Sequence, residues 1–255
     1  MLIYGIIVLY NKIFEKTSYE ALMENGVTLI VCDNSTKDMG NGKKVADAGA
    51  YYISMGGNKG LACAYNRAID MIRDELSPDK HDYVCLFDDD TEIPVNYPDE
   101  IKLRHEPILL PIVNDGIGLM SPCLMKDKIV KRFGSVKEAL RADERQITGI
   151  NSCMAVRWDC YDNYRYDENM FLDYIDHAFI FEMRKRGIYP TVLNYKIKQH
   201  FSAVEDTKKR AAKRFAKQKA DLKIFYGDRK LVYYYIIMRK HIKLALKYRD
   251  IRFLK

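Results

Sequence analysis

Short apolar runs alternate with segments of helical periodicity through the N-terminal part of the chain. Runs of the length of buried strands occupy residues 2–9, 27–32, 51–54 and 83–87. A Ser/Thr-led stretch at 17–26 ends in glycine, as capped helices do, and apolar positions recur at three- and four-residue steps over 61–76. We expect a polar turn from Asp33 to Lys44. Strands that alternate with helices predict an α/β fold with a Rossmann-like, mostly parallel sheet flanked by helices.

The pattern becomes less regular beyond Pro94. Strands are expected near 117–121 and 129–133 and just before residue 200, and a helix at about 176–186 is closed by Gly187. From Thr207 onward, basic residues are mixed with Phe, Tyr, Leu and Ile in a way that is typical of basic amphipathic helices. We therefore expect a catalytic domain over 1–206 and a helical tail over 207–255.

Charge separates these two segments. The net charge of +7 combines a tail holding 17 basic and 3 acidic residues with a domain holding 25 basic and 32 acidic ones. A basic amphipathic tail suits an anionic membrane surface or packing on the main domain. Nucleic acid is not expected as a partner because no motif that reads RNA or DNA accompanies the charge. The apolar, tyrosine-rich tail leaves the oligomeric state open.

The location of the protein is expected to be cytoplasmic. The opening apolar run lacks a basic n-region and a small-residue cleavage site, and no run approaches the roughly 20 residues needed to span a bilayer. The six cysteines include no Cys-x-x-Cys pair, which fits a reducing compartment. With the basic tail, these features predict a peripheral protein on the inner face of the cell membrane.

Unusual polar residues follow directly after three of the expected strands: Asn11, the segment 33–35 and Asp88 to Asp90. The carboxyl ends of parallel strands form one edge of the sheet, where ligands of open α/β folds bind. A glycine-rich segment, 56–60, leads into the expected helix at 61, so its backbone N–H groups and the positive end of the helix dipole should face the same edge. The sequence predicts a crevice for an anionic ligand.

Three adjacent aspartates need a cation or several hydrogen-bond donors to offset their mutual repulsion. Mg²⁺ or Mn²⁺ would provide this, because hard divalent ions prefer carboxylate oxygens and share their coordination with substrate phosphates.

These motifs together resemble family 2 glycosyltransferases, which have the GT-A fold. The resemblance rests on Val-Leu-Tyr-Asn11, Asp-Asn-Ser35, the spaced pattern from Asn58 through Gly60, Ala62 and Ala64 to Asn66, Phe-Asp-Asp-Asp-Thr91 and Phe-Leu-Asp-Tyr-Ile-Asp176. It covers about the first 200 residues and is strongest toward the rhamnosyltransferase and galactofuranosyltransferase branch that builds bacterial surface polysaccharides. The tail lies outside it.

The resemblance implies a UDP- or dTDP-linked sugar donor lying across the strand ends. Tyr10 and Asn11 would lie beside the base, Asp33 would bond the base or ribose, and Gly60 would permit close backbone approach. Asp88 would contact the ribose, and Asp90 would bind the metal with His200. The residues expected at the donor site are Tyr10, Asn11, Asp33, Asn58, Gly60, Asn66, Asp88 and Asp89.

Chemistry at the acceptor requires a general base that takes a hydroxyl proton as the new bond forms. Asp173 and Asp176 are the candidates, and we favour Asp173. If the helix already includes residue 173, their spacing puts both on one face; otherwise Asp176 could cap the helix. Tyr174 stands where the family often has an aspartate.

The sequence therefore predicts an inverting, metal-dependent glycosyltransferase that acts on a glycan or lipid-linked acceptor. One alternative is a nucleotidyltransferase, but residues 11–15 lack the glycine- and lysine-rich loop expected after its first strand. The other is a non-catalytic nucleotide- or glycan-binding protein at the membrane, for which an acceptor base would have no purpose.

Overall fold

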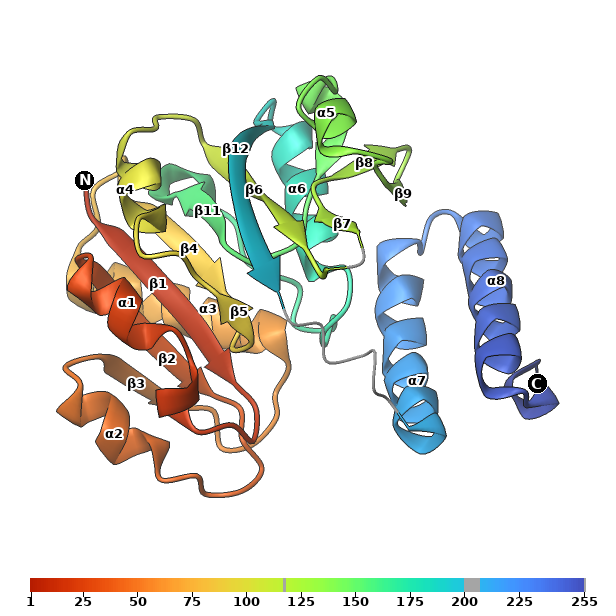
Figure 1. Ribbon diagram of the computed structural model, residues 1–255, viewed down its shortest axis with the longest axis horizontal. Helices are drawn as coiled ribbons and strands as arrows, with labels where there is room; N and C mark the ends of the chain where they lie inside the picture. Colours follow the sequence, from red (N-terminus) through yellow and green to blue (C-terminus); the bar gives the residue numbers. More distant parts are fainter. Residues whose placement is uncertain (117, 200–206, 255) are drawn as a thin grey trace.

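A mostly parallel sheet forms the centre of the computed structural model, which describes residues 1–116, 118–199 and 207–254. Its strands lie in the order β3-β2-β1-β4-β11-β6-β12-β5, and β7 pairs with β6 (Figure 1). In this order the strands from β3 to β4 are mutually parallel, as are β6 and β12. Strand β11 lies between β4 and β6 and is antiparallel to both. The strand bounds are β1 Ile3–Leu9, β2 Val27–Asp33, β3 Tyr51–Ser54, β4 Tyr83–Phe87, β5 Thr91–Glu92, β6 Ile108–Asn114, β7 Leu119–Ser121, β11 Met154–Arg157 and β12 Pro190–Gln199.

Helices cover both faces of this sheet because its strands are apolar on both sides. In β1, Tyr4 and Ile6 pack into a core with α3 and α6, whereas Ile3 and Ile7 point to the opposite face, toward α1, α2 and α4. Burying each such isoleucine contributes about 2 kcal/mol to folding. The helix bounds are α1 Tyr19–Glu24, α2 Asn41–Asp47, α3 Leu61–Met71, α4 Tyr97–Lys102, α5 Val136–Ala139 and α6 Ile175–Lys185.

Smaller elements complete the domain. A second sheet has the order β10-β8-β9, with strands β8 Cys123–Lys126, β9 Ile129–Arg132 and β10 Ile147–Thr148. A π-helical turn, Ile72–Leu76, extends α3. Short 3-10 turns lie at Phe14–Lys16, Glu144–Gln146, Trp158–Tyr161 and Ile251–Leu254.

The predicted fold class is confirmed, and the predicted strands at 51–54 and 83–87 match β3 and β4. The predicted polar turn from Asp33 to Lys44 was wrong in its second half, because α2 begins at Asn41. Only Asn41 and Val45 of this short helix are buried, so it has no apolar periodicity to reveal it.

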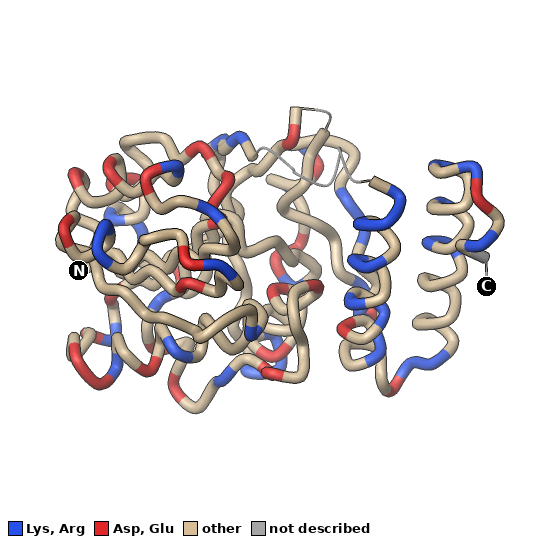
Figure 2. Tube along the Cα trace, turned by 90° about the horizontal axis from the view of Figure 1, so that it is seen from below, with Lys and Arg blue, Asp and Glu red and all other residues tan. Residues whose placement is uncertain are grey.

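The tail is helical, as predicted, and forms α7 Lys208–Phe225 and α8 Lys230–Tyr248, which lie side by side beyond the sheet (Figure 1). Phe215, Leu222 and Phe225 of α7 belong to the same core as α3 and α6. Lysines and arginines are spread along both helices (Figure 2). Among the described residues, no helix is long and apolar enough to cross a membrane.

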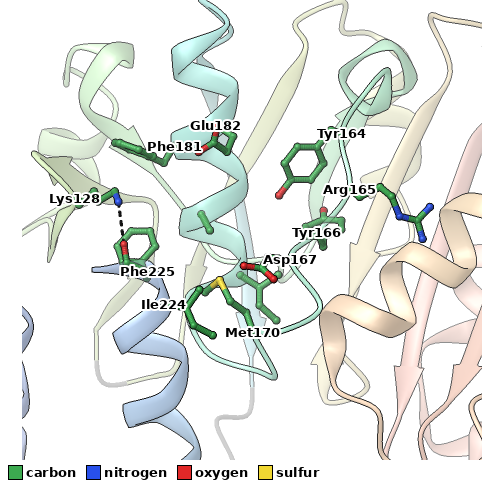
Figure 3. A pocket seen from close by; sticks show the side chains of 12 residues that line it. Lys128, Tyr164, Arg165, Tyr166, Asp167, Met170, Phe181, Glu182, Ile224 and Phe225 are labelled. Carbon is green, nitrogen blue, oxygen red and sulfur yellow. Dashed lines mark hydrogen bonds between the residues drawn. The ribbon is translucent and has the colours of Figure 1, made fainter. Parts of the chain in front are cut away.

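Asp221 of α7 holds the tail to the domain. Its carboxylate is completely buried and accepts hydrogen bonds from the backbone N–H groups of Phe171, Leu172 and Asp173, at 2.7–2.9 Å. A cavity of about 190 Å³ lies at this junction, where α7 meets α6 and the 164–170 loop (Figure 3). At its edge Lys128 donates a hydrogen bond to the carbonyl of Phe225. The helix α7 is thus continuous with the packing of the domain.

Candidate functional site

A hollow of about 340 Å³ opens at the carboxyl ends of β2 and β3, where the sequence predicts the donor nucleotide. Asp33 lines it and is held rigidly: its Oδ2 accepts hydrogen bonds from Asn41 Nδ2 at 3.0 Å and from the Tyr52 hydroxyl at 3.2 Å. Its Oδ1 accepts from the Ser35 N–H at 2.9 Å. The hollow is within the size range of small-molecule sites.

Tyr10 and Asn11 lie beside this region at the end of β1 and are both exposed. The Asn11 side-chain oxygen accepts hydrogen bonds from the backbone N–H and the hydroxyl of Thr36. The backbone N–H of Asn11 donates a hydrogen bond to the Ser35 hydroxyl. These bonds connect the segments that follow β1 and β2. Asn11 also has a left-handed backbone, with φ 52°, which asparagine tolerates better than most residues.

The glycine-rich segment 56–60 uses its N–H groups within the protein. The Lys59 N–H donates to Asn34 Oδ1, the Gly60 N–H to Asn58 Oδ1 and the Leu61 N–H to the Phe171 carbonyl. The expectation that the segment 56–60 has free N–H groups for an anion is therefore wrong at Gly56, Lys59 and Gly60, whose N–H groups are bonded within the protein. The buried Asn34 also donates a hydrogen bond from its Nδ2 to the Gly60 carbonyl, so both ends of its side-chain amide bond this loop.

Gly60 permits a close backbone approach, but its neighbour is Phe171 rather than a ligand. Its φ of 90° is favourable only for glycine, and a Cβ at this position would lie 2.7 Å from the Phe171 carbonyl oxygen. The contact joins the start of α3 to the segment that carries Asp173. A contact between Gly60 or Asn58 and a donor stays a prediction.

The three aspartates lie after β4 and have different partners. Asp88 Oδ2 accepts hydrogen bonds from the Ser152 hydroxyl and from Gln199 Nε2. Burial is the largest cause that raises the pKa of Asp88; the Ser152 bond lowers it and the charges of Asp90, Asp89 and Asp176 raise it, so that the pKa is about 6. Asp88 therefore carries a costly negative charge at neutral pH.

Asp89 faces Lys12, whose Nζ lies 3.5 Å from its Oδ1 and donates a hydrogen bond to its carbonyl oxygen. Burial raises the pKa of Asp89, and the charge of Lys12 opposes that effect. The cation thus offsets part of the repulsion within the acidic cluster. Lys12 was not predicted as a site residue, although it directly follows Asn11 after the first strand.

Gln199, at the end of β12, joins Asp88 to Asp90. Its Nε2 lies 2.8 Å from Asp88 Oδ2 and 3.4 Å from Asp90 Oδ1, while its buried Oε1 has no partner among the described residues. An unpaired oxygen beside two carboxylates is a donor set that suits a hard cation. His200, the predicted second metal ligand, lies outside the described residues.

Within the ranges 1–116, 118–199 and 207–254, no group of three or more His, Cys, Asp or Glu side chains is placed to hold a metal ion. This observation does not conflict with a magnesium-type site, since Mg²⁺ is commonly held by one or two carboxylates together with substrate phosphates. Asp90 and the Gln199 amide oxygen fit that arrangement.

The structure separates the two candidate bases. Tyr174 has a left-handed backbone, with φ 67°, and α6 begins only at Ile175, so Asp173 and Asp176 do not share a helical face. Asp176 lies in the first turn, close enough for its charge to raise the pKa of Asp88 and Tyr65. It does not cap the helix, because Tyr174 occupies the cap position.

Asp173 faces the tail. Its Oδ1 accepts a hydrogen bond from Gln218 Nε2 of α7 at 2.8 Å. Burial raises the pKa of Asp173, and the hydrogen bond from Gln218 and the charges of Lys240 and Arg214 oppose this effect. The sequence could not reveal these partners because all of them lie in the tail.

Two further segments contact the site loops. Asn66 exchanges hydrogen bonds with the backbone of Tyr166 and donates to Glu168, so its amide orders that loop and its contact with a donor stays a prediction. Ser152, which precedes β11, donates a hydrogen bond from its hydroxyl to Asp88. The single tryptophan, Trp158, packs in the core.

No family model and no curated protein matches this chain. Among solved structures, 4-diphosphocytidyl-2C-methyl-D-erythritol synthase is similar over 75% of this chain and 88% of its own, with 11% identity and a TM-score of 0.44. Protein A197 from STIV is similar over 76% of this chain and 82% of its own, with 13% identity and a TM-score of 0.40. Likenesses this distant assign neither a ligand nor an activity.

Proposed function

We propose that the protein is an inverting, metal-dependent glycosyltransferase of the family 2 type, which moves a sugar from a nucleoside diphosphate donor to a hydroxyl group. One observation carries the proposal. The half-buried, hydrogen-bonded Asp88 stands with Asp90 and Gln199, whose Oε1 has no partner among the described residues, at the same sheet edge as the hollow that holds Asp33. That edge is where α/β folds bind nucleotides.

Different residues would contact different parts of the sugar donor. Asp33, fixed by Asn41 and Tyr52, would accept a hydrogen bond from the base or ribose. Asp88 would accept one from the ribose, and Asp90 with Gln199 would hold Mg²⁺ or Mn²⁺. When bound, the ion would neutralise the negative charge that develops on the departing nucleoside diphosphate.

We assign the general base to Asp176, which changes the preference derived from the sequence. Its charge acts on Asp88, whereas the carboxylate of Asp173 is directed to Gln218 of the tail. Asp176 Oδ1 also accepts a hydrogen bond from the His177 N–H at 2.7 Å, which orients the carboxylate. It would take the proton of the acceptor hydroxyl as that oxygen attacks the anomeric carbon.

A thermal-shift experiment tests the donor site. UDP, dTDP, GDP and CDP are each added with and without Mn²⁺ to the protein, to Asp90→Asn and to Asp47→Asn, an exposed aspartate at the far end of α2. One nucleotide should raise the melting temperature in a metal-dependent way, with the shift lost in Asp90→Asn and kept in Asp47→Asn. No shift with any nucleotide would refute the proposal.

The products separate the three classes of protein. A glycosyltransferase releases a nucleoside diphosphate when a sugar donor and an acceptor are present. A nucleotidyltransferase releases pyrophosphate from a nucleoside triphosphate and a sugar phosphate, and a binding protein releases neither. Inversion is checked from the anomeric configuration of the product by NMR. In the glycosyltransferase, Asp176→Asn should lower kcat by about a hundredfold or more while the nucleotide shift remains.

The acceptor is proposed to be a glycan or lipid-linked glycan at an anionic membrane surface. The outer face of α8 supports this, because it exposes large apolar residues among basic ones: Leu231, Tyr234, Tyr235, Met238, Ile242 and Leu246. Leu231 and Leu246 are 87% and 74% exposed, so polar residues there should not disturb packing.

Sedimentation with vesicles of phosphatidylglycerol tests the membrane contact. Leu231→Ser combined with Leu246→Ser should weaken sedimentation without changing the melting temperature, since both side chains are exposed. Leu103→Ser, at an exposed leucine after α4, is the matched control. Equal sedimentation of all three proteins would refute a membrane role for this face.

A further inference from the structure

A second cavity, of about 250 Å³, lies between α7 and α8 and reaches Asp173. It is lined by basic side chains from both helices, namely Arg214, Lys240, Lys243 and Lys247, with Asp173, Gln218 and Tyr248 among its polar residues. The resemblance to a known family ends before the tail, so nothing in it accounts for this cavity.

The cavity concentrates positive charge. Four cationic groups line it against one carboxylate. Burial lowers the pKa of Lys240, and the charges of Arg214 and Lys243 lower it further, whereas Asp173 opposes them. Like charges gathered in a partly buried space cost free energy that a bound anion would offset.

Two hydrogen-bond acceptors in the same cavity have no partner within the described residues. Gln218 is 8% exposed, and its Nε2 donates to Asp173 Oδ1, which leaves the buried Gln218 Oε1 and Asp173 Oδ2 unpaired. A buried acceptor without a donor costs about 1–3 kcal/mol. A phosphate oxygen cannot supply that donor, but a hydroxyl group can.

We propose that this cavity binds a phosphate group that carries adjacent hydroxyls, such as a phosphorylated sugar or polyol. The phosphate contacts Arg214, Lys243 and Lys247, and the hydroxyls donate to Asp173 and Gln218. The assignment of this ligand as part of the acceptor rests on the proposed function; its binding does not. The group could come from a lipid headgroup or from a soluble phosphate ester.

The helix α8 separates this site from the membrane face. Lys240, Lys243 and Lys247 repeat at three- and four-residue steps along one side, and the exposed apolar residues from Leu231 to Leu246 occupy the opposite side. Substitutions in the cavity therefore leave the apolar face unchanged, so the two sites can be tested independently.

Isothermal titration calorimetry on the full chain, without nucleotide, uses glycerol 1-phosphate, inorganic phosphate and glycerol as probes. Glycerol 1-phosphate should bind about tenfold more tightly than inorganic phosphate, because it also satisfies the two acceptors. Lys243→Gln combined with Lys247→Gln should weaken its binding by about tenfold or more. Lys209→Gln combined with Lys223→Gln, at exposed positions of α7 outside the cavity, should bind as the unaltered protein does.

The source of the group is tested with vesicles of phosphatidylglycerol and of phosphatidylserine at equal charge. A preference for phosphatidylglycerol that is lost in the Lys243/Lys247 variant supports a lipid headgroup, and binding of free glycerol 1-phosphate supports a soluble ester. Absence of both, or binding that the Lys243/Lys247 variant retains, overturns the proposal.

A selectivity test examines the hydroxyl contacts. Gln218→Leu should remove the preference for glycerol 1-phosphate over inorganic phosphate, and equal affinity for these two probes in the unaltered protein would overturn the assignment of the hydroxyls. The metal-dependent nucleotide shift should persist in all of these variants. Failure of the cavity proposal is thereby distinguishable from failure of the transferase proposal.

Discussion

Replacing Gly60 by alanine tests the contact that joins the glycine-rich segment to the loop before α6. The new Cβ would lie 2.7 Å from the Phe171 carbonyl oxygen and 3.2 Å from its Cα, both of which are backbone atoms. The Phe171 carbonyl also accepts a hydrogen bond from the Leu61 N–H, and the Phe171 N–H is bonded to Asp221. Phe171 therefore cannot move aside without breaking other bonds.

Two costs combine in this variant. An alanine at φ 90° loses about 1–2 kcal/mol to backbone strain, and crowding against a fixed neighbour adds about 1–3 kcal/mol. We expect Gly60→Ala to lower the free energy of unfolding by about 2–5 kcal/mol, the sum of the two. Gly56→Ala is the matched control, because Gly56 also has a positive φ, 64°, but nothing lies within 4 Å of its added Cβ. It should cost only about 1–2 kcal/mol.

Urea unfolding followed by circular dichroism measures both values, with unchanged slopes indicating that the unfolded states are comparable. Hydrogen exchange at residues 171–173 should accelerate in Gly60→Ala and stay unchanged in Gly56→Ala. Equal destabilisation of the two variants, within about 0.5 kcal/mol, would refute the reasoning, because strain without crowding would then explain both.

Three other variants examine the site and its supports. Because the pKa of Asp88 is raised from 3.8 to about 6, the folded state holds this proton more tightly, so stability is lost as the pH rises through that interval, by about 3 kcal/mol at most. In EDTA, Asp88→Asn should not show this loss, so it should be more stable than the unaltered protein above pH 6. Urea titrations that find the same pH dependence of stability in both proteins between pH 4 and 6 would contradict this. Asp221→Asn should lower the free energy of unfolding by about 3 kcal/mol, because the new amide N–H group faces backbone donors. Asp228→Asn, at an exposed position, should lower it only slightly. Equal destabilisation of the two variants in calorimetry would argue against the anchoring role of Asp221. Asn34→Ala should lower the free energy of unfolding by about 2 kcal/mol, because it leaves the Lys59 N–H unpaired and removes one of the two hydrogen bonds that the Gly60 carbonyl accepts. Unaltered exchange of the Lys59 amide would count against it.

The sheet edge could be predicted because its signals are local. Asp33 and Asp88 each follow an apolar run of strand length, and parallel strands bring their carboxyl ends together whatever their order in the sheet. The helix α6 was similarly predicted at about 176–186, with its end marked by Gly187, which has a φ of 76°. The helix α2 escaped prediction because a short helix that buries few residues leaves little periodic pattern.

Several site residues had no such signal. Gln199 was passed over in favour of its neighbour His200, and only the pairing of β12 with β5 and β6 brings its amide to Asp88 and Asp90. The role of Lys12 depends on its ion pair with Asp89, which lies far along the chain. A glutamine or a lysine is common on any surface, so neither residue type marks a site without its neighbours.

The sequence by itself determined the alternation of strands and helices, the positions of the acidic residues at the strand ends and the basic character of the tail, because these depend on neighbouring residues and on composition. Tertiary structure alone decided that Gly60 accommodates Phe171, that the charge of Asp176 acts on Asp88 and that Asp173 opens into a basic cavity. The physical reason is that burial, crowding and charge interactions depend on distances between residues far apart in the chain. The left-handed Tyr174 and the docking of α7 set those distances, and no local pattern encodes either of them.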